Sequence, residues 1–259
     1  MKSIGFIGGG RVTRIILQAF AQTDVTADRI EIYDPNPAVF EALNNCYPDL
    51  SCSSDNIRPA AGCELVFLAV HPPAMMEVLQ QTKPHLSPDT LVVSLAPKFT
   101  MEKISAILDG LPNVARINPS ASTWICQGVN PVCFATTCDP AKKEQLLSLI
   151  RLMGFTPEVD EHKIEAYAMI SAMGHTYFWF QLRKLHELAV AFGLEPEEAT
   201  RTITLMMEGT LETLFHSGLT YEQVVDLIPV KPLSAGEENI LKMYDEYLVP
   251  LYEKIRPTG

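Results

Sequence analysis

Residues 4–13, which read IGFIGGGRVT, determine the fold that we expect for the first half of the chain. The apolar run from Ser3 to Ile7 predicts a short strand, and Arg11 to Gln22 predicts a helix because its apolar residues recur at helical spacing. Between them, Gly8 permits a tight turn, and Gly10 has no side chain to keep the backbone away from a pyrophosphate. The first turn of such a helix offers free N–H groups and a positive dipole end to phosphates. The order of strand, glycine-rich turn and helix therefore predicts dinucleotide binding.

Two further positions refine this prediction. Thr13 occupies the third fingerprint position, where glycine or alanine is usual, and we expect it to loosen the contact between helix and strand. Asp34 follows a second predicted strand, Arg29 to Tyr33, and lies 24 residues beyond Gly10. A carboxylate there accepts hydrogen bonds from the ribose hydroxyls of NAD and repels the additional phosphate of NADP. NAD is therefore favoured, and NADP stays open because Arg11 or a more remote base could bind that phosphate.

Strand-like and helix-like segments alternate as far as Pro157, a pattern typical of βαβ units around a parallel sheet. Further strands are predicted at Leu65–Val70, Leu91–Leu95, Val114–Ile117 and Val132–Ala135. Further helices are predicted at Pro37–Asn44, Ala74–Gln81, Met101–Leu108 and Ala141–Met153. Residues 1–157 are therefore expected to form an α/β domain of the Rossmann type, with a parallel sheet.

Residues 158–259 are expected to form an all-helical domain that mediates dimerisation. Glu161 to Phe192 predicts one long helix, and the other helices are predicted at Glu197–His216, from an N-cap at Thr220 to Leu227, and at Ser234–Ile255. The consecutive aromatic residues 177–180 cover several faces of the long helix, so it needs neighbours on every side. A second copy of the chain could supply them, which predicts a homodimer; a monomeric core is the alternative.

Composition limits the classes of partner and the compartment. The chain has 31 acidic and 20 basic residues, a net charge of −11, which argues against nucleic acid or an anionic membrane as a partner. No apolar run approaches the ~20 residues that a membrane-spanning helix needs, and the N-terminus lacks the pattern of a signal peptide. The six cysteines have no metal-ligand spacing and are expected to be reduced thiols. A small-molecule substrate, a cytoplasmic location and no metal are therefore expected.

Several motifs resemble those of the pyrroline-5-carboxylate reductases, a family that pairs an N-terminal Rossmann domain with a helical dimerisation domain. IGFIGGGRVTRII resembles the family's IGFIGxGNMAxAI, VFLAVHPP resembles VFLAVKPQ, and RINPSAS resembles RxMPNTPA. The resemblance implies reduction of a C=N bond in proline biosynthesis and a cofactor that lies near the ends of several strands. The cofactor-binding residues predicted from the turn and the resemblance together are Gly8, Gly10, Arg11, Val12, Asp34, Asn56, Ala69, Val70, His71, Pro72 and Ala96.

The sequence departs from that family at the segments that bind substrate. ISAMGHTY, residues 170–177, stands where the family has LSGSGPAY, and IPVKPLS, residues 228–234, stands in place of TSPGGTT. The general reaction implied is therefore hydride transfer to or from a C=N or C=O bond of a small metabolite. Ser171 and His175 are the candidate catalytic residues, because they lie where the family places its substrate pocket and a histidine can supply a proton near neutral pH.

Two alternatives remain open. A β-hydroxyacid-type dehydrogenase shares the same domain plan but carries a catalytic lysine in the first helix of its second domain, and neither Lys163 nor Lys184 is well placed for that role. A dinucleotide-sensing protein that kept the cofactor site and lost catalysis would also explain the altered substrate segments.

Overall fold

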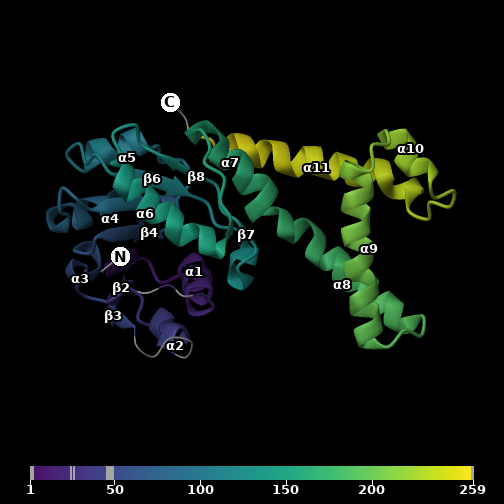
Figure 1. Cartoon of the computed structure of the whole chain (residues 1–259), viewed down its shortest axis with the longest axis horizontal. Helices are drawn as coiled ribbons and strands as arrows, with labels where there is room; N and C mark the ends of the chain where they lie inside the picture. Colours follow the sequence, from purple (N-terminus) through teal and green to yellow (C-terminus); the bar gives the residue numbers. More distant parts are fainter. Residues whose placement is uncertain (1–2, 24, 26, 45–49, 258–259) are drawn as a thin grey trace. The chain divides into compact units, whose positions relative to one another are not determined.

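The computed structural model describes residues 3–23, 25, 27–44 and 50–257, and the chain divides into two compact units (Figure 1). The first unit consists of Met1–Met173 with Tyr252–Gly259, and the second is Gly174–Leu251. Residues 158–173 thus pack with the first unit, so the two units differ from the predicted domain limits of 1–157 and 158–259.

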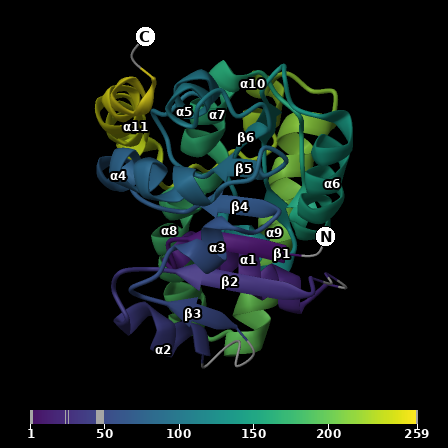
Figure 2. The ribbon, with the colours of Figure 1, turned by 90° about the vertical axis from the view of Figure 1, so that its left-hand side faces the viewer.

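The first unit is built on a seven-stranded sheet with the order β3-β2-β1-β4-β5-β6-β8 (Figure 2). The first six strands in this order are parallel to their neighbours, and β8 is antiparallel to β6. The chain runs outward in both directions from β1, which puts a topological switch point between β1 and β4 and confirms the predicted Rossmann-type fold. The strands are β1 Ser3–Ile7, β2 Arg29–Tyr33, β3 Ser51–Ser53, β4 Leu65–Leu68, β5 Leu91–Ser94, β6 Val114–Ile117 and β8 Val132–Phe134, with a separate parallel pair of β7 Gly128–Val129 and β9 Gly154–Phe155.

Helices cover both faces of this sheet (Figure 2). On β1, Ile4 and Phe6 join the buried cluster that includes α1 and α6, while Ile7 joins the opposite cluster, because successive side chains of a strand point to opposite faces. The first face carries α1 Arg11–Ala21 and α6 Pro140–Ile150, and the second carries α3 Arg58–Ala61, α4 Pro72–Thr82 and α5 Met101–Ile107. The shorter elements of this unit are α2 Ala38–Asn44, η1 Lys83–His85, η2 Ala121–Ile125, η3 Arg151–Met153 and η4 Glu161–Lys163.

The prediction of one unbroken helix from Glu161 to Phe192 is wrong. After η4, the chain forms α7 Ile164–Tyr167 and then a π-helical turn, η5 Ala168–Ala172, before α8 begins at Gly174. The Met173 N–H donates to the Ala168 carbonyl at 2.9 Å, five residues back, so the regular α-helical ladder is interrupted here. Glycine is a poor helix former, and a π-turn of this kind often marks a functional site.

The second unit is entirely helical, as predicted. It contains α8 Gly174–Ala191, α9 Pro196–His216, α10 Tyr221–Asp226 and most of α11 Ser234–Ile255, whose last turn belongs to the first unit. Thr220 is the predicted N-cap of α10, and it forms a capping box with Gln223. Within the described residues of these helices, only Gly174 and Ala199 are buried, so the expected all-round burial of α8 is absent from the single chain.

Among the described residues, none of the helices has the length and apolar character that crossing a membrane requires.

Candidate cofactor and substrate site

The turn after β1 requires glycine at position 8. Gly8 has a φ of +108°, a conformation that L side chains rarely adopt, and its N–H donates to the Tyr33 carbonyl at 2.7 Å. A Cβ added at Gly8 would lie 2.5 Å from the Ala69 carbonyl oxygen. The backbone conformation of the turn therefore explains why position 8 needs glycine. The turn also brings the ends of β1, β2 and β4 together.

Gly10 has a different role, because among the described residues no heavy atom outside its own stretch of backbone lies within 4 Å of the position that its Cβ would occupy. Gly10 is the N-cap of α1, and the first backbone bond of that helix runs from the Arg14 N–H to the Gly10 carbonyl at 3.1 Å. The backbone N–H groups that precede Arg14 in the helix have no partner within the helical ladder. Open space above a helix N-terminus fits a diphosphate, with Arg11 exposed and Val12 half-buried beside it.

The expectation that Thr13 loosens the contact between α1 and β1 is wrong. Thr13 is fully buried, and its hydroxyl donates to the Gly8 carbonyl at 2.6 Å. A glycine or alanine could not form this bond, because the bond needs the side-chain hydroxyl. Thr13 therefore ties the helix to the glycine-rich turn.

Asp34 organises the same turn from the end of β2. One oxygen of its carboxylate accepts a hydrogen bond from the Gly9 N–H at 2.8 Å, and the other accepts one from the Asn36 N–H at 2.9 Å. Each carboxylate oxygen has two lone pairs, so these contacts leave capacity for ribose hydroxyls. Asp34 thus has a structural role in the turn that the sequence did not reveal, and its contact with a cofactor stays a prediction.

The other predicted cofactor residues follow β3, β4 and β5, and these strands are parallel, so their carboxyl ends meet at one edge of the sheet. Backbone hydrogen bonds join these ends, among them Ala69 N–H to Ile7 at 2.8 Å and Leu95 N–H to Leu68 at 3.1 Å. The residues placed at this edge are Asn56 after β3, Ala69, Val70, His71 and Pro72 at the junction of β4 and α4, and Ala96 after β5. Their contact with a cofactor stays a prediction.

Ala96 borders a cavity of about 260 Å³ at the carboxyl ends of β5 and β6. Polar groups line part of it: Arg116 from β6, Asn118 just beyond it, and Glu165 from α7. Arg116 is 1% exposed, and its guanidinium contacts the Glu165 carboxylate at 2.5 Å and the Glu161 carboxylate at 3.1 Å. Ala168 and Ala172 from the π-turn complete part of the wall.

The acidic residue of this cavity, Glu165, could not be identified from the sequence. An arginine inside the apolar strand VARI was the available signal, because a buried guanidinium requires a carboxylate partner. The partner Glu165 is 49 residues further along the chain, and spacing alone does not connect the two.

The two candidate catalytic residues lie in different units. Ser171 belongs to the π-turn of the first unit, where its hydroxyl donates to the Tyr167 carbonyl at 2.8 Å. His175 lies in the first turn of α8 in the second unit, and its ring lies 5.7 Å from that of Trp179. Their roles stay a prediction.

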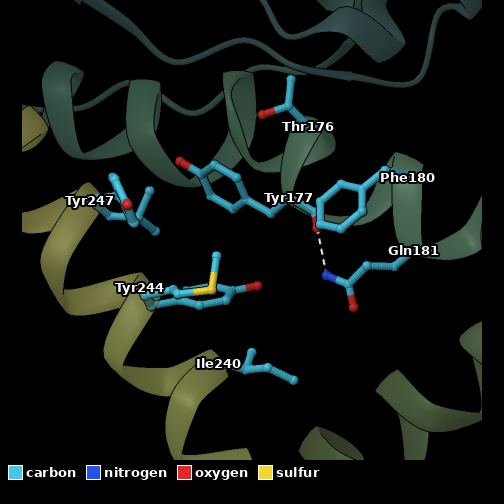
Figure 3. A pocket seen from close by; sticks show the side chains of 9 residues that line it. Thr176, Tyr177, Phe180, Gln181, Ile240, Tyr244 and Tyr247 are labelled. Atoms are coloured by element: carbon cyan, nitrogen blue, oxygen red, sulfur yellow. Dashed lines mark hydrogen bonds between the residues drawn. The ribbon is translucent and has the colours of Figure 1, made fainter. Parts of the chain in front are cut away.

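The second unit contains a larger cavity of about 430 Å³ between α8 and α11 (Figure 3). The rings of Tyr177 and Tyr244 lie edge to face with their centroids 6.0 Å apart, and the Gln181 side chain donates to the Tyr177 carbonyl. Burial, and then the neighbouring Tyr244, raise the pKa of Tyr177. Most of the lining is aromatic or aliphatic, so this cavity suits an apolar occupant.

The family described as "NADP oxidoreductase coenzyme F420-dependent" matches residues 3–98. A pyrroline-5-carboxylate reductase of Staphylococcus aureus is 24% identical over 252 residues, 96% of this chain and 92% of that protein. The structure of a pyrroline-5-carboxylate reductase from Coxiella burnetii is similar at 25% identity and a TM-score of 0.66, covering 97% of this chain and 93% of that one. The Plasmodium falciparum pyrroline carboxylate reductase with NADP bound has the same fold, at 21% identity and a TM-score of 0.74, covering 97% and 94%.

Proposed function

We propose that this member of the pyrroline-5-carboxylate reductase family is a nicotinamide-dinucleotide-dependent oxidoreductase that transfers a hydride to or from the C=N bond of a small metabolite. The observation that carries the proposal is the open space at Gly10 above the N-terminus of α1, next to the Asp34 carboxylate. The likeness to pyrroline-5-carboxylate reductases over nearly the whole chain supports the type of reaction.

Different residues at the carboxyl edge of the sheet would bind different parts of the cofactor and the substrate. The first turn of α1 would hold the diphosphate, and Asp34 would accept hydrogen bonds from a ribose, which favours NAD over NADP. When bound in reduced form, the nicotinamide supplies the hydride. The cavity beside Ala96 would hold the hydride acceptor and keep it away from water.

Titration calorimetry with NADH and NADPH tests cofactor binding, and a panel of cyclic imines and keto acids tests turnover through the loss of reduced-nicotinamide absorbance. We expect tighter binding of NADH and turnover of at least one cyclic imine. Absence of binding to either nucleotide would refute the proposal. Tight binding without turnover on the whole panel would favour a dinucleotide-sensing protein instead.

Ser171 or His175 is proposed to contact the substrate, because both lie beside Gly174 in the sequence, where the missing side chain leaves room. His175 could supply a proton to the acceptor atom near neutral pH. The variants Ser171→Ala and His175→Ala test this assignment: at least one should reduce kcat with the best imine substrate. Full turnover in both would show that neither residue takes part in the reaction.

A second copy of this chain is the proposed partner of the helical unit. The aromatic residues Phe178, Trp179 and Phe180 of α8 are 45%, 55% and 67% exposed, which is much apolar surface for one helix. A homodimer would bury it. Sedimentation velocity tests this: the double variant Trp179→Glu with Phe180→Glu should shift dimers to monomers. Phe155→Glu, which changes an exposed aromatic residue of the first unit, is the control and should leave the dimer intact.

The cytoplasm is the proposed location, and the state of the thiols supports it. Cys52, Cys63, Cys126, Cys133 and Cys138 are free, while Cys46 lies outside the described residues. Free thiols are typical of reducing compartments. Fractionation of cells that produce the protein at its natural level tests this location.

A further inference from the structure

We propose that Glu165 is a specificity-determining residue that binds the positively charged nitrogen of the substrate in the cavity beside Ala96, an inference that rests on the proposed function. The cavity of about 260 Å³ is large enough for a small cyclic metabolite, and Glu165 forms part of its wall. This cavity lies at the carboxyl ends of β5 and β6, the edge at which ligands bind in open parallel sheets.

The Glu165 carboxylate is buried, and within the described residues only one of its two oxygens accepts a hydrogen bond. The residue is 1% exposed, and one oxygen, Oε1, accepts a hydrogen bond from the Arg116 guanidinium. The other oxygen, Oε2, is buried and accepts no hydrogen bond within the described part of the chain. An unpaired acceptor in the interior is costly. Because Glu165 is a wall residue of the cavity, a donor on a molecule bound there could pair with this oxygen after a small shift of the side chain.

The charges around this oxygen favour a cation. Arg116 contributes one positive charge, and the carboxylates of Glu161 and Glu165 that contact it contribute two negative charges. Glu161 also accepts the Met101 N–H at 2.7 Å, so one of its oxygens already has two donors. The three groups together therefore carry one net negative charge, and the unpaired acceptor among them is on Glu165. An N–H group with a positive charge would pair with this oxygen and balance the charge.

Asn118 supplies the complementary group on the same cavity. Its side-chain Nδ2 is buried and donates no hydrogen bond within the described residues. Asn118 is a wall residue of the cavity, and an amide N–H can bind a carboxylate or carbonyl oxygen of a ligand. Glu165 and Asn118 together suit a small molecule that carries a protonated ring nitrogen and an oxygen acceptor.

The chemistry of C=N reduction explains why such a residue would matter. A C=N bond accepts a hydride at carbon more readily when its nitrogen is protonated, because the two π electrons then move onto a cationic nitrogen and leave an amine. A fixed carboxylate stabilises that cation where water is excluded. The same position discriminates against a carbonyl, whose oxygen carries no proton to donate.

Ligand binding in the presence of saturating NAD⁺ tests the proposal without turnover. L-Proline carries a ring ammonium, and tetrahydrofuran-2-carboxylate has an uncharged oxygen at the same ring position. We expect the wild-type protein to bind L-proline at least about tenfold more tightly, as one charge-assisted hydrogen bond allows. Glu165→Gln should bring this ratio close to one. Glu161→Gln removes the same charge from the group around Arg116 but leaves the unpaired Glu165 oxygen in place, so it should keep most of the ratio.

A second variant tests the proposal in case Glu165→Gln does not fold. Glu165→Asp keeps a negative charge beside Arg116 but withdraws the carboxylate from the cavity, so it should fold and still lose severalfold of the preference for L-proline. Equal preference in the wild type and in both variants would overturn the proposal, as would a wild type that does not discriminate. Failure of the wild type to bind NAD⁺ is a different result, because it would refute the proposed function itself.

Discussion

The carboxylate of Asp34 accepts a hydrogen bond from the backbone N–H of Gly9 at 2.8 Å. This contact joins the end of β2 to the middle of the glycine-rich turn after β1, so a residue that would recognise a ribose also fixes the backbone that would bind a diphosphate. Asp34 is therefore expected to affect cofactor affinity in two ways, through its own contact with the ribose and through the geometry of the turn.

Asp34→Ala should weaken NADH binding by about 10- to 100-fold, the range expected when one or two hydrogen bonds to a charged group are lost. Calorimetry on the wild type and the variant measures this change. Asp28→Asn, which removes an exposed acidic charge just before β2, is the control and should bind NADH normally. An unchanged affinity in Asp34→Ala would mean that this carboxylate contacts no part of the cofactor.

Replacing Gly8 by alanine should mainly lower stability, whereas replacing Gly10 by alanine should mainly weaken cofactor binding. Gly8→Ala puts a side chain at a φ of +108° and 2.5 Å from a carbonyl oxygen, so it should lower the free energy of unfolding by about 2 kcal/mol or more. Gly10→Ala meets no atom within 4 Å, so it should cost less than about 1 kcal/mol. It should nevertheless raise the Kd for NADH at least about tenfold, because the new methyl group occupies the space of the diphosphate.

Urea unfolding and calorimetry on both variants separate these effects. If Gly10→Ala binds NADH as the wild type does, the phosphates cannot lie above this residue. If Gly8→Ala is as stable as the wild type, the turn can adopt another backbone conformation.

The sheet could be predicted from the sequence because its signals are local. The strands Arg29–Tyr33 and Val114–Ile117 have their predicted limits, and the glycine-rich turn has its predicted place between β1 and α1. β3, Ser51–Ser53, was missed because three small residues give no periodic apolar signal. The π-turn at Ala168–Ala172 was missed for a related reason: its residues are good helix formers, and only the Met173 N–H bond reveals the wider turn.

The candidate site was predictable in part for the same reason. Gly8, Gly10 and Asp34 follow a motif with fixed spacing, whereas the contact between Arg116 and Glu165 joins β6 to α7 and depends on the tertiary fold. Thr13 is a case in which motif reasoning misled, because a departure from the usual small residue is compensated by a hydrogen bond to Gly8.

Thr220→Ala should lower the free energy of unfolding by about 1 kcal/mol. The Thr220 hydroxyl accepts the Gln223 N–H, and the Gln223 side chain accepts the Thr220 N–H, so the substitution breaks a reciprocal cap. Thr210→Ala is the control, because the Thr210 hydroxyl bonds back to the carbonyl and the sulfur of Met206, one turn earlier in α9, and alanine is a good helix former. Urea unfolding at a fixed protein concentration measures both. Equal losses in the two variants would mean that the cap contributes nothing beyond the loss of a hydroxyl.

Cys133 should make the protein less stable at alkaline pH. Burial raises the pKa of this thiol from 9.0 to about 12, against the opposing effect of Arg116. The native state thus holds the proton more tightly than the unfolded state, so this contribution to stability is complete below pH 9 and falls by about 1 kcal/mol per pH unit as the pH rises towards 12.

Urea unfolding of the wild type and of Cys133→Ala between pH 8 and about 11 measures this contribution. The variant loses packing at every pH, so the informative quantity is the slope of stability against pH, which should be shallower in the variant. Cys138→Ala is the comparison. Burial is also the main cause of the raised pKa of Cys138, but this residue is only half-buried, so the slope should change less in this variant. Parallel pH profiles for the wild type and Cys133→Ala would mean that the unfolded and native thiols titrate alike, and that water reaches Cys133 in the native protein.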